Sequence, residues 1–402
     1  MAKAKWRGPT PLSYFRENGI HGGRVVSMGE AKKGNGRSTP RRHTLQLLRS
    51  THSLLSPTLM KMSLCLFGFV GLLAAAPAST VTPPTTSAVF SGSDYQALIE
   101  RIGKMEKSAA HPLFARHCRS LSALVQSEWA RAQLFPKESK LPQLLLSDLA
   151  AIAKGLNAGN DRWEAFRDAG QPLVLAHLSK RDQTLQIYHV VLPRDWDETR
   201  EYPLYLELHA YGGPEIRPLG WTQMTLGPAP DFDNKHCAIH TYPMVARDGF
   251  HVFPYGRGNS NYEDIGELDI WEALADTETT FKIDPRRRYL HGFSMGGSGT
   301  FLLAAKRPEL WAAIAILGSS PGLRDAPEGL ARSLAALPVF LWSGEKDEWF
   351  DGAKRKAAVL RQTGSAPREI IFDPAHAHEY LHDAQKQAHE FLRAHTKPVE
   401  QP

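Results

Sequence analysis

Residues 288–297 read RYLHGFSMGG, and the expected fold follows from this segment. A β-rich run leads into a G-x-S-x-G pattern centred on Ser294, and residues with a helical pattern follow as far as residue 306. Small residues two positions before and two after a serine allow a sharp strand-to-helix turn that projects the hydroxyl outward. The stretch therefore predicts a strand, a tight turn that carries Ser294, and a helix whose N-terminus favours negative charge. A glycine-rich turn of purely structural use is the alternative.

Short apolar runs alternate with helical patterns around this stretch. Strands are expected at 173–178, 185–192, 204–208, 251–253, 288–292, 312–317, 339–342 and 369–372. Helices are expected near 262–280, 295–306, 351–362 and 379–395. Two early strands followed by strand and helix in alternation predict an α/β domain over residues 172–396, with a mostly parallel eight-stranded sheet and flanking helices. Such sheets place their sites at the carboxyl ends of the strands.

A different pattern precedes this domain. Residues 79–93 are rich in Thr, Pro and Ser and are expected to form a linker. Residues 94–168 carry apolar residues at helical spacing, and Asp94 is expected to cap the first helix. The sequence therefore predicts a small helical segment in front of the α/β domain, as a packing or lid element.

The charge of the chain is unevenly distributed. The 402 residues include 48 Lys and Arg against 42 Asp and Glu, a formal net charge of +6, which invites a nucleic-acid or anionic-membrane partner. Residues 1–59 alone carry eleven of the basic residues against two acidic ones. This leader has few apolar clusters and is expected to be disordered or not translated at all. Because the rest of the chain is slightly acidic, no nucleic-acid partner is expected.

Residues 60–78 read MKMSLCLFGFVGLLAAAPA, which is the pattern of a secretory signal peptide. We expect translation to start at Met60 or Met62 and the product to be exported to the periplasm or outside the cell. The apolar run is short for a bilayer crossing, which needs about 20 residues. A buried helix or a single membrane anchor is the alternative. After cleavage two cysteines remain, Cys118 and Cys237, and these could pair in an exported protein.

The loop that follows the strand at 204–208 is rich in glycine and reads HAYGG over 209–213. A glycine-bearing loop after a central strand lets backbone N–H groups point at a substrate oxygen. We expect the N–H of Tyr211 or Ala210, together with that of Met295, to form an oxyanion hole. An ordinary glycine turn is the alternative.

The next two strands lead to an acid and a base. The segment SGEKDE follows the strand at 339–342, and Asp347 is the preferred acid, with Glu345 and Glu348 as rivals and a solvated charged loop as the alternative. The segment DPAHAHEYLH follows the last strand, and the order Ser, Asp, His along the chain fits a catalytic triad. His378 is the preferred general base and His376 is the second choice.

Residues 378–382 also read H-E-x-x-H, the pattern of zinc peptidases. On a helix it would place His378 and His382 on one face. His378 is expected at the helix start rather than within it, and only twenty residues follow to supply a third ligand. A zinc peptidase is therefore the weaker hypothesis.

Residues 172–396 resemble the α/β-hydrolase superfamily. VVLPRDWDETREYPLYLELHAYGG, PYGRGNSNYEDIGELDIWEAL and IDPRRRYLHGFSMGGSGTFLLAAKRPELWAAIAILGS are similar to exported esterases related to feruloyl esterases and polyester depolymerases, and also to the catalytic domain of the prolyl oligopeptidase family. The resemblance implies a covalent acyl-enzyme with no metal or organic cofactor. The G-x-x-D loop and the His-Glu pair at the final helix are the usual forms of the superfamily, which supports Asp347 and His378.

The substrate class follows less directly. Prolyl oligopeptidases usually carry a propeller domain of several hundred residues, which this chain lacks, so a small-molecule or polymer-linked ester is expected rather than a peptide. The segment from Arg257 to Asp269 nevertheless resembles the peptidases, unless Asp269 simply caps the loop or pairs with Arg257 or Arg287.

A non-catalytic ligand-binding domain is a further alternative. In either case the aromatic residues expected to line the pocket are Tyr211, Trp221, Tyr255 and Trp349.

Overall fold

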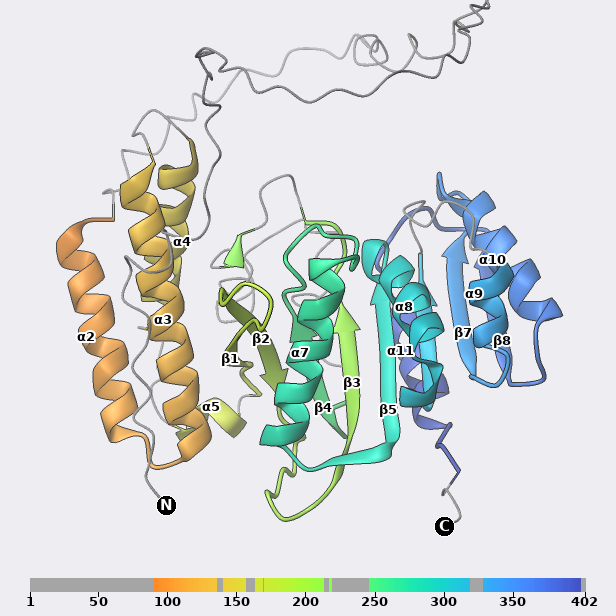
Figure 1. The fold of residues 1–402 in the computed structure, drawn as a ribbon, viewed down its shortest axis with the longest axis horizontal. Helices are drawn as coiled ribbons and strands as arrows, with labels where there is room; N and C mark the ends of the chain where they lie inside the picture. Colours follow the sequence, from red (N-terminus) through yellow and green to blue (C-terminus); the bar gives the residue numbers. More distant parts are fainter. Residues whose placement is uncertain are drawn as a thin grey trace, which may run out of the picture. The chain divides into compact units, whose positions relative to one another are not determined.

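Within the residues that the computed structural model describes, eight strands form one sheet (Figure 1). The described residues are 90–135, 140–156, 163–168, 170–212, 217–218, 246–318 and 328–398, and all belong to one unit. The strands are β1 (Leu173–Leu178), β2 (Leu185–Val191), β3 (Tyr202–Leu208), β4 (Phe250–Pro254), β5 (Ile283–Phe293), β6 (Ala313–Leu317), β7 (Val339–Gly344) and β8 (Arg368–Asp373).

The strand order is that of a mostly parallel sheet with an antiparallel strand near one edge. The strands lie in the order β1-β2-β4-β3-β5-β6-β7-β8. β2 pairs antiparallel with β1 and β4, and every other pairing is parallel. The predicted α/β-hydrolase sheet is therefore confirmed.

Helices cover both faces of the sheet. They are α2 (Gly92–Ser108), α3 (Pro112–Leu134), α4 (Lys140–Leu156), α5 (Trp163–Asp168), α7 (Ile265–Thr280), α8 (Met295–Lys306), the 3-10 helix η2 (Pro308–Leu310), α9 (Glu328–Ser333), α10 (Phe350–Gln362) and α11 (His382–Arg393). In Figure 1, α7 and α8 lie in front of the sheet and α11 lies behind it. The last helix begins three residues later than predicted, and η2 and α9 were not predicted.

The alternation of side chains along β3 shows why a sheet covered on both faces reads as a continuous apolar run. Leu204 and Leu206 belong to the hydrophobic cluster that includes residues of α7 and α8. Tyr205 belongs to a second cluster that includes Ala388 and Leu392 of α11. All residues of β3 are buried.

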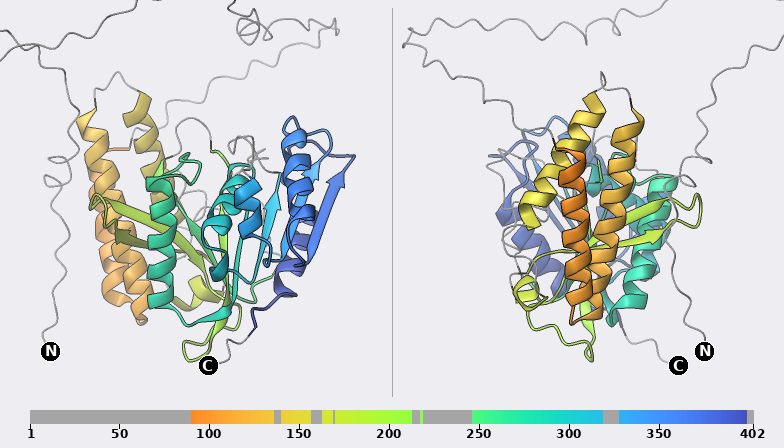
Figure 2. Two further views of the ribbon diagram at one scale, coloured as in Figure 1. Left: turned by 45° about the vertical axis from the view of Figure 1, so that its right-hand side comes forward. Right: turned by 90° about the vertical axis from the view of Figure 1, so that its left-hand side faces the viewer.

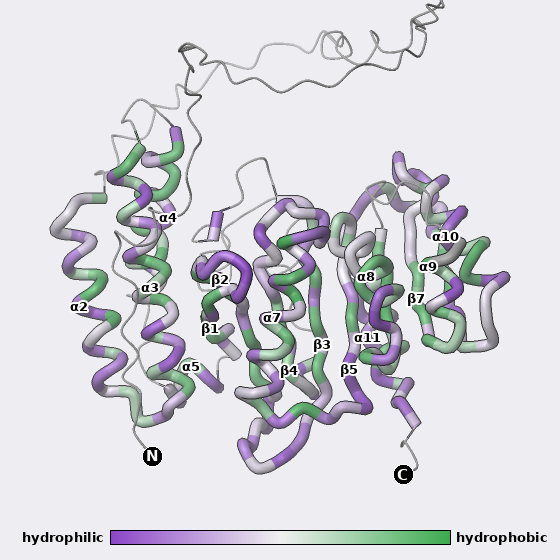
Figure 3. Tube along the Cα trace, viewed as in Figure 1, coloured by the Kyte–Doolittle hydropathy of each residue, from purple (hydrophilic) through white to green (hydrophobic). Residues whose placement is uncertain are grey.

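The N-terminal helical segment is present as predicted, with a different cap. The side chain of Ser91 accepts a hydrogen bond from the Asp94 N–H at 3.3 Å, and Asp94 accepts one from the Ser91 N–H at 2.7 Å. This is a capping box, in which the acid occupies the third helical position. Asp94 is therefore not the cap, because Ser91 takes that place. Figure 3 shows hydrophobic and hydrophilic residues in alternating bands along α2 and α3.

Helix α3 packs against β1, the strand at one end of the sheet (Figure 2). The N–H of Val174 donates to Nδ1 of buried His117 at 2.8 Å, and Arg116 donates to the Ala176 carbonyl at 3.4 Å. Unpaired backbone groups on an edge strand invite pairing with another chain unless something covers them. The helical segment therefore closes this edge of the sheet.

Several predictions concern residues outside those that the structure describes. The leader 1–59, the signal peptide 60–78, linker residues 79–89 and Cys237 all lie there, so the predictions for them stand as predictions. Cys118 is buried and carries a free thiol. Among the described residues, no helix combines the length and apolar character that crossing a membrane requires.

Candidate active site

Ser294 occupies the turn between β5 and α8 in a strained backbone conformation. Its φ is 58° and its ψ is −117°, and its N–H donates to the Leu317 carbonyl at 2.9 Å. A Cβ at Gly292 would lie 2.6 Å from the carbonyl carbon of Gly296, and one at Gly296 would lie 2.7 Å from that of Leu208. Only glycine fits at these two positions, which accounts for the G-x-S-x-G pattern. Such strain costs roughly 1–3 kcal/mol, which the surrounding contacts must offset.

Ser294, His378 and Asp347 form one hydrogen-bonded chain. Ser294 Oγ lies 2.8 Å from His378 Nε2, and His378 Nδ1 lies 2.7 Å from Asp347 Oδ2. The side chains of Asp347 and His378 are 1% and 15% exposed. Because a carboxylate only accepts, Nδ1 is assigned as the donor to Asp347, and Nε2 then accepts from the serine hydroxyl. The structure thus brings together the three preferred residues, which come from three separate loops.

Backbone hydrogen bonds between the loops after β7 and β8 place Asp347 beside His378. The N–H of Glu345 donates to the carbonyl oxygen of Asp373, the last residue of β8, at 2.8 Å, and the N–H of Lys346 donates to that of His376 in the loop at 3.0 Å. A Cβ at Gly344 would lie 2.6 Å from a carbonyl carbon of that loop. The two loops can approach this closely only because residue 344 is a glycine.

Two aromatic rings hold the imidazole of His378 from its sides. The ring centroid of Phe293 lies 4.8 Å from that of His378, and the ring of Trp349 lies 4.5 Å away at 87°. The N–H of Trp349 also donates to Asp347 Oδ1 at 2.9 Å. Ring packing and hydrogen bonds therefore fix the orientation of the imidazole together.

The rival residues lie in less suitable places. Glu345 and Glu348 are exposed, whereas Asp347 is buried. His376 lies 2.9 Å from Asp373, through Nδ1 and Oδ2, and does not contact Ser294 in any hydrogen bond that the described residues make.

The H-E-x-x-H pattern does not lie on a helix. His378 lies in the loop before α11, and His382 is the first residue of that helix. The two imidazoles therefore lack the shared helical face on which the zinc motif depends. Within the described ranges, no group of three or more metal-ligating side chains is found.

The loop after β3 lies against the first turn of α8. A Cβ at Gly296 would lie 2.9 Å from the His209 carbonyl oxygen. Met295 is the first residue of α8, where an N–H has no acceptor within the helix. Ala210 is buried, and Tyr211 is 53% exposed. The N–H groups predicted to form the oxyanion hole therefore belong to two segments in direct contact.

The structure separates the aromatic residues predicted for the pocket. Trp349 packs on His378, as described above, and Tyr211 is exposed. Tyr255 is 9% exposed, and its ring packs into the main hydrophobic cluster. Trp221 lies outside the described residues.

Among the described residues, Asp269 forms no side-chain ion pair with Arg257 or Arg287. The rise of its pKa on burial is partly offset by the positive charge of Arg257 and by the backbone N–H groups of Gly256 and Arg257, which fits the predicted capping role. Arg257 donates to Asp182 at 2.9 Å, and Arg287 forms an ion pair with Asp284 within β5. The nearest ion-pair partner of Asp269 is His177, whose Nε2 lies 3.6 Å from Oδ1. Burial raises the pKa of Asp269 to about 7.

Two residues that sequence reasoning did not single out hold the loop after β3. Asn259 makes hydrogen bonds to both backbone groups of Gly212, and the Tyr262 hydroxyl donates to the His209 carbonyl. A run of Gly, Asn and Ser after a strand signals a turn, but it does not tell which distant backbone the turn binds.

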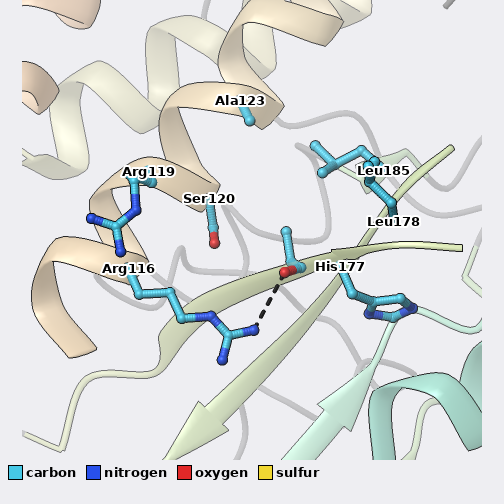
Figure 4. A pocket seen from close by; sticks show the side chains of 8 residues that line it. Arg116, Arg119, Ser120, Ala123, His177, Leu178 and Leu185 are labelled. Atoms are coloured by element: carbon cyan, nitrogen blue, oxygen red, sulfur yellow. Dashed lines mark hydrogen bonds between the residues drawn. The ribbon is translucent and has the colours of Figure 1, made fainter. Parts of the chain in front are cut away.

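A separate cavity of about 280 Å³ lies between α3 and the β1–β2 hairpin (Figure 4). Arg116 and Ser120 line it from α3, and His177, Leu178 and Leu185 line it from the strands. Arg116 is already paired with a carboxylate of α7. The cavity therefore offers mainly apolar walls.

A family model described as "Putative esterase" matches residues 178–397, more than half of the chain. It favours the esterases over the prolyl oligopeptidases, whose resemblance is less supported.

One solved structure similar to the chain is a thermostable esterase, with 17% sequence identity, coverage of 56% of this chain and 64% of that one, and a TM-score of 0.43. Another is a ferulic acid esterase, with 18% identity, coverage of 56% of this chain and 98% of that one, and a TM-score of 0.41. A third is the feruloyl esterase module from Clostridium thermocellum in complex with sinapinate, with 15% identity, coverage of 56% of this chain and 86% of that one, and a TM-score of 0.41. The chain thus spans just under two thirds of the first of these proteins. These low TM-scores add no argument of their own, but the family match alone is decisive: the protein belongs to the esterase family.

Proposed function

We propose that the protein is an exported serine hydrolase that cleaves carboxylic esters through an acyl-enzyme on Ser294. The observation that carries the proposal is the hydrogen-bonded chain from Ser294 through His378 to Asp347, with distances of 2.8 and 2.7 Å. A serine hydroxyl is a weak nucleophile until an adjacent base accepts its proton. The position of His378 Nε2 fits that requirement.

In the first half of the reaction, Ser294 Oγ attacks the ester carbonyl carbon and its proton passes to His378 Nε2. The imidazolium that forms is stabilised by the buried carboxylate of Asp347. Collapse of the tetrahedral intermediate breaks the bond to the alcohol oxygen, which takes the proton from His378 and leaves. The acyl group remains bound to Ser294.

In the second half, His378 accepts a proton from water as the water oxygen attacks the acyl carbon. Ser294 Oγ then leaves and recovers that proton, so the acid is released and the enzyme is restored. In both halves the negative oxygen would bind the N–H groups of Met295 and of Ala210 or Tyr211. Removal of one such hydrogen-bond donor typically lowers kcat by about 10²–10³-fold.

An ester is favoured over a peptide because the peptidase-like segment already has a structural role. Arg257, Asn259 and Tyr262 bind Asp182 and the loop after β3, so the resemblance of this segment to peptidases does not require a peptide-binding function. Trp349 and the exposed Tyr211 offer aromatic surface to an acyl or leaving group.

The test is replacement of Ser294 by alanine. Ser294→Ala is expected to abolish turnover of short p-nitrophenyl esters and labelling by a fluorophosphonate probe, while Ser365→Ala, at an exposed serine, keeps both. Labelling of Ser294→Ala at the wild-type level would refute the assignment. Feruloyl and acetyl esters compared with aminoacyl naphthylamides distinguish an esterase from a peptidase.

Export rests on the sequence of residues 60–78. N-terminal sequencing of the protein from its own cells is expected to give a start near residue 79. Recovery of peptides from residues 1–59 would contradict both the proposed start and the proposed cleavage.

A further inference from the structure

Asn259 binds both backbone groups of a single residue in the loop after β3. The N–H of Gly212 donates to Asn259 Oδ1 at 3.0 Å, and Asn259 Nδ2 donates to the Gly212 carbonyl at 2.6 Å. Two hydrogen bonds from one planar amide fix the orientation of a backbone segment as well as its position. Asn259 therefore anchors the far end of the loop that carries Ala210 and Tyr211.

Tyr262 anchors the near end of the same loop. Its hydroxyl donates to the His209 carbonyl at 2.8 Å, and the residue is completely buried. A Cβ at Gly299 of α8 would lie 2.9 Å from the ring carbon Cγ of Tyr262, so the ring is packed directly on the helix that begins beside Ser294. The hydroxyl can hardly move without moving α8.

The segment that supplies both side chains is held in an unfavourable backbone conformation. Arg257, Asn261, Tyr262 and Asp264 have φ values of 60°, 56°, 58° and 48°, the left-handed region that L residues other than glycine rarely adopt. Strain of this kind persists only where the surrounding structure over-determines it, and it gathers at functional sites. In this conformation the segment brings the side chains of Asn259 and Tyr262 into hydrogen-bonding contact with the loop after β3.

The anchored loop lies against the nucleophile's helix. The close approach of Gly296 to the carbonyls of Leu208 and His209 joins the end of β3 to the first turn of α8. Ala210 and Tyr211 lie between the two anchored residues, His209 and Gly212. Their N–H groups are therefore held at a fixed distance from the turn that carries Ser294.

We infer that Asn259 is a positioning residue for the oxyanion hole: it keeps the Ala210–Tyr211 segment aimed at the negative oxygen that forms during attack by Ser294. The inference rests on the proposed function, and it assigns the Asn-rich turn after β4 to transition-state stabilisation. Asn259 itself does not contact the reacting atoms in this scheme.

The first test is Asn259→Ala, with Asn261→Ala as the matched control. Asn261 is an exposed residue of the same type two positions away, and its φ of 56° lies in the left-handed region. Asn259→Ala is expected to lower kcat for a p-nitrophenyl ester about 10–100-fold, less than the loss of a donor outright, with KM changed less than about twofold. Asn261→Ala is expected to lower the thermal midpoint with little effect on kcat.

A merely structural role is excluded by comparing two ligands. An aryl trifluoromethyl ketone adds to a serine hydroxyl and forms an oxyanion, whereas the corresponding secondary alcohol does not. Asn259→Ala is expected to weaken binding of the ketone by the same factor by which it lowers kcat/KM, and to leave binding of the alcohol unchanged. Equal weakening of both ligands would overturn the inference.

Tyr262→Phe provides an independent variant that keeps the buried ring and removes only the hydroxyl. It is expected to lower kcat about 3–10-fold at unchanged KM, since a single hydrogen bond is lost. Wild-type kcat in folded Asn259→Ala or Tyr262→Phe would overturn the inference alone, provided that Ser294→Ala is inactive. Activity retained in Ser294→Ala would instead contradict the proposed function.

Discussion

Gly296→Ala is expected to be among the most damaging single-methyl additions in the chain. A Cβ at this position would lie nearest to the Leu208 carbonyl oxygen, 2.7 Å from the Leu208 carbonyl carbon and 2.9 Å from the His209 oxygen. All of these neighbours are backbone atoms, so no side chain can rotate to make room. Carbon atoms pack favourably at about 3.5–4.0 Å, so the end of β3 and the first turn of α8 must separate by about 1 Å.

Two effects follow from that separation. Overpacking of this kind costs typically 1–3 kcal/mol of unfolding free energy, measured by urea denaturation. The same movement draws the loop after β3 away from Ser294, and a displacement of about 1 Å can lower kcat roughly 100-fold. We therefore expect a variant that is folded but weakened, with a loss of activity larger than its loss of stability explains.

Gly103→Ala is the matched control, because nothing lies within 4 Å of a Cβ there and the residue is inside α2. It is expected to stabilise the protein by about 0.5–1 kcal/mol and to leave kcat unchanged. Wild-type kcat in Gly296→Ala would refute the reasoning, because it would mean that contact between β3 and α8 does not determine the position of the loop after β3.

Two further predictions concern buried charges. Arg217 binds the carboxylate of Asp148 through two hydrogen bonds of 2.6 and 3.0 Å, so Asp148→Ala should lower the unfolding free energy by about 3 kcal/mol. A change below about 0.5 kcal/mol in urea denaturation would count against a structural role of this pair. Asp269 has its pKa raised by burial from 3.8 to about 7, so between those values the folded chain holds a proton that the unfolded chain has lost. The protonated carboxyl therefore adds on the order of 4 kcal/mol to the unfolding free energy below pH 4, and this contribution is lost as the pH rises through 7. In denaturation curves recorded from pH 4 to 8, Asp269→Asn should abolish this decrease of the unfolding free energy with pH.

The sequence predicted the sheet and the Ser294 turn because both depend on local patterns. Strands covered on both faces are continuous apolar runs, and all eight were expected, although β5 begins five residues before its predicted start at residue 288. The glycines at 292 and 296 are required by backbone contacts of the turn itself, so they appear at fixed spacing from Ser294.

What the sequence could not predict depends on contacts between distant segments. Asn259 binds a residue 47 positions away, and no periodicity marks such a bond. The last helix begins at His382, three residues after its predicted start, and a pattern of apolar residues does not show how long the loop must be that holds His378 between Ser294 and Asp347. Tyr255 was expected at the pocket because it lies in the loop after a predicted strand, but the sequence does not show the direction of a loop side chain, and this one packs into the main hydrophobic cluster.

The folding unit extends beyond the part of the chain that the family match covers. That match begins at residue 178, yet one hydrophobic cluster joins residues of α2, α3 and α4 to residues of β1 and β3. Asp148 of α4 also binds Arg217, five residues beyond Gly212, which Asn259 holds. The chain after β3 is thus anchored at one point by the turn after β4 and at another by the N-terminal helices. Removing the helices would uncover β1 and release Arg217 from Asp148, so the helices belong to the same folding unit as the sheet that carries Ser294.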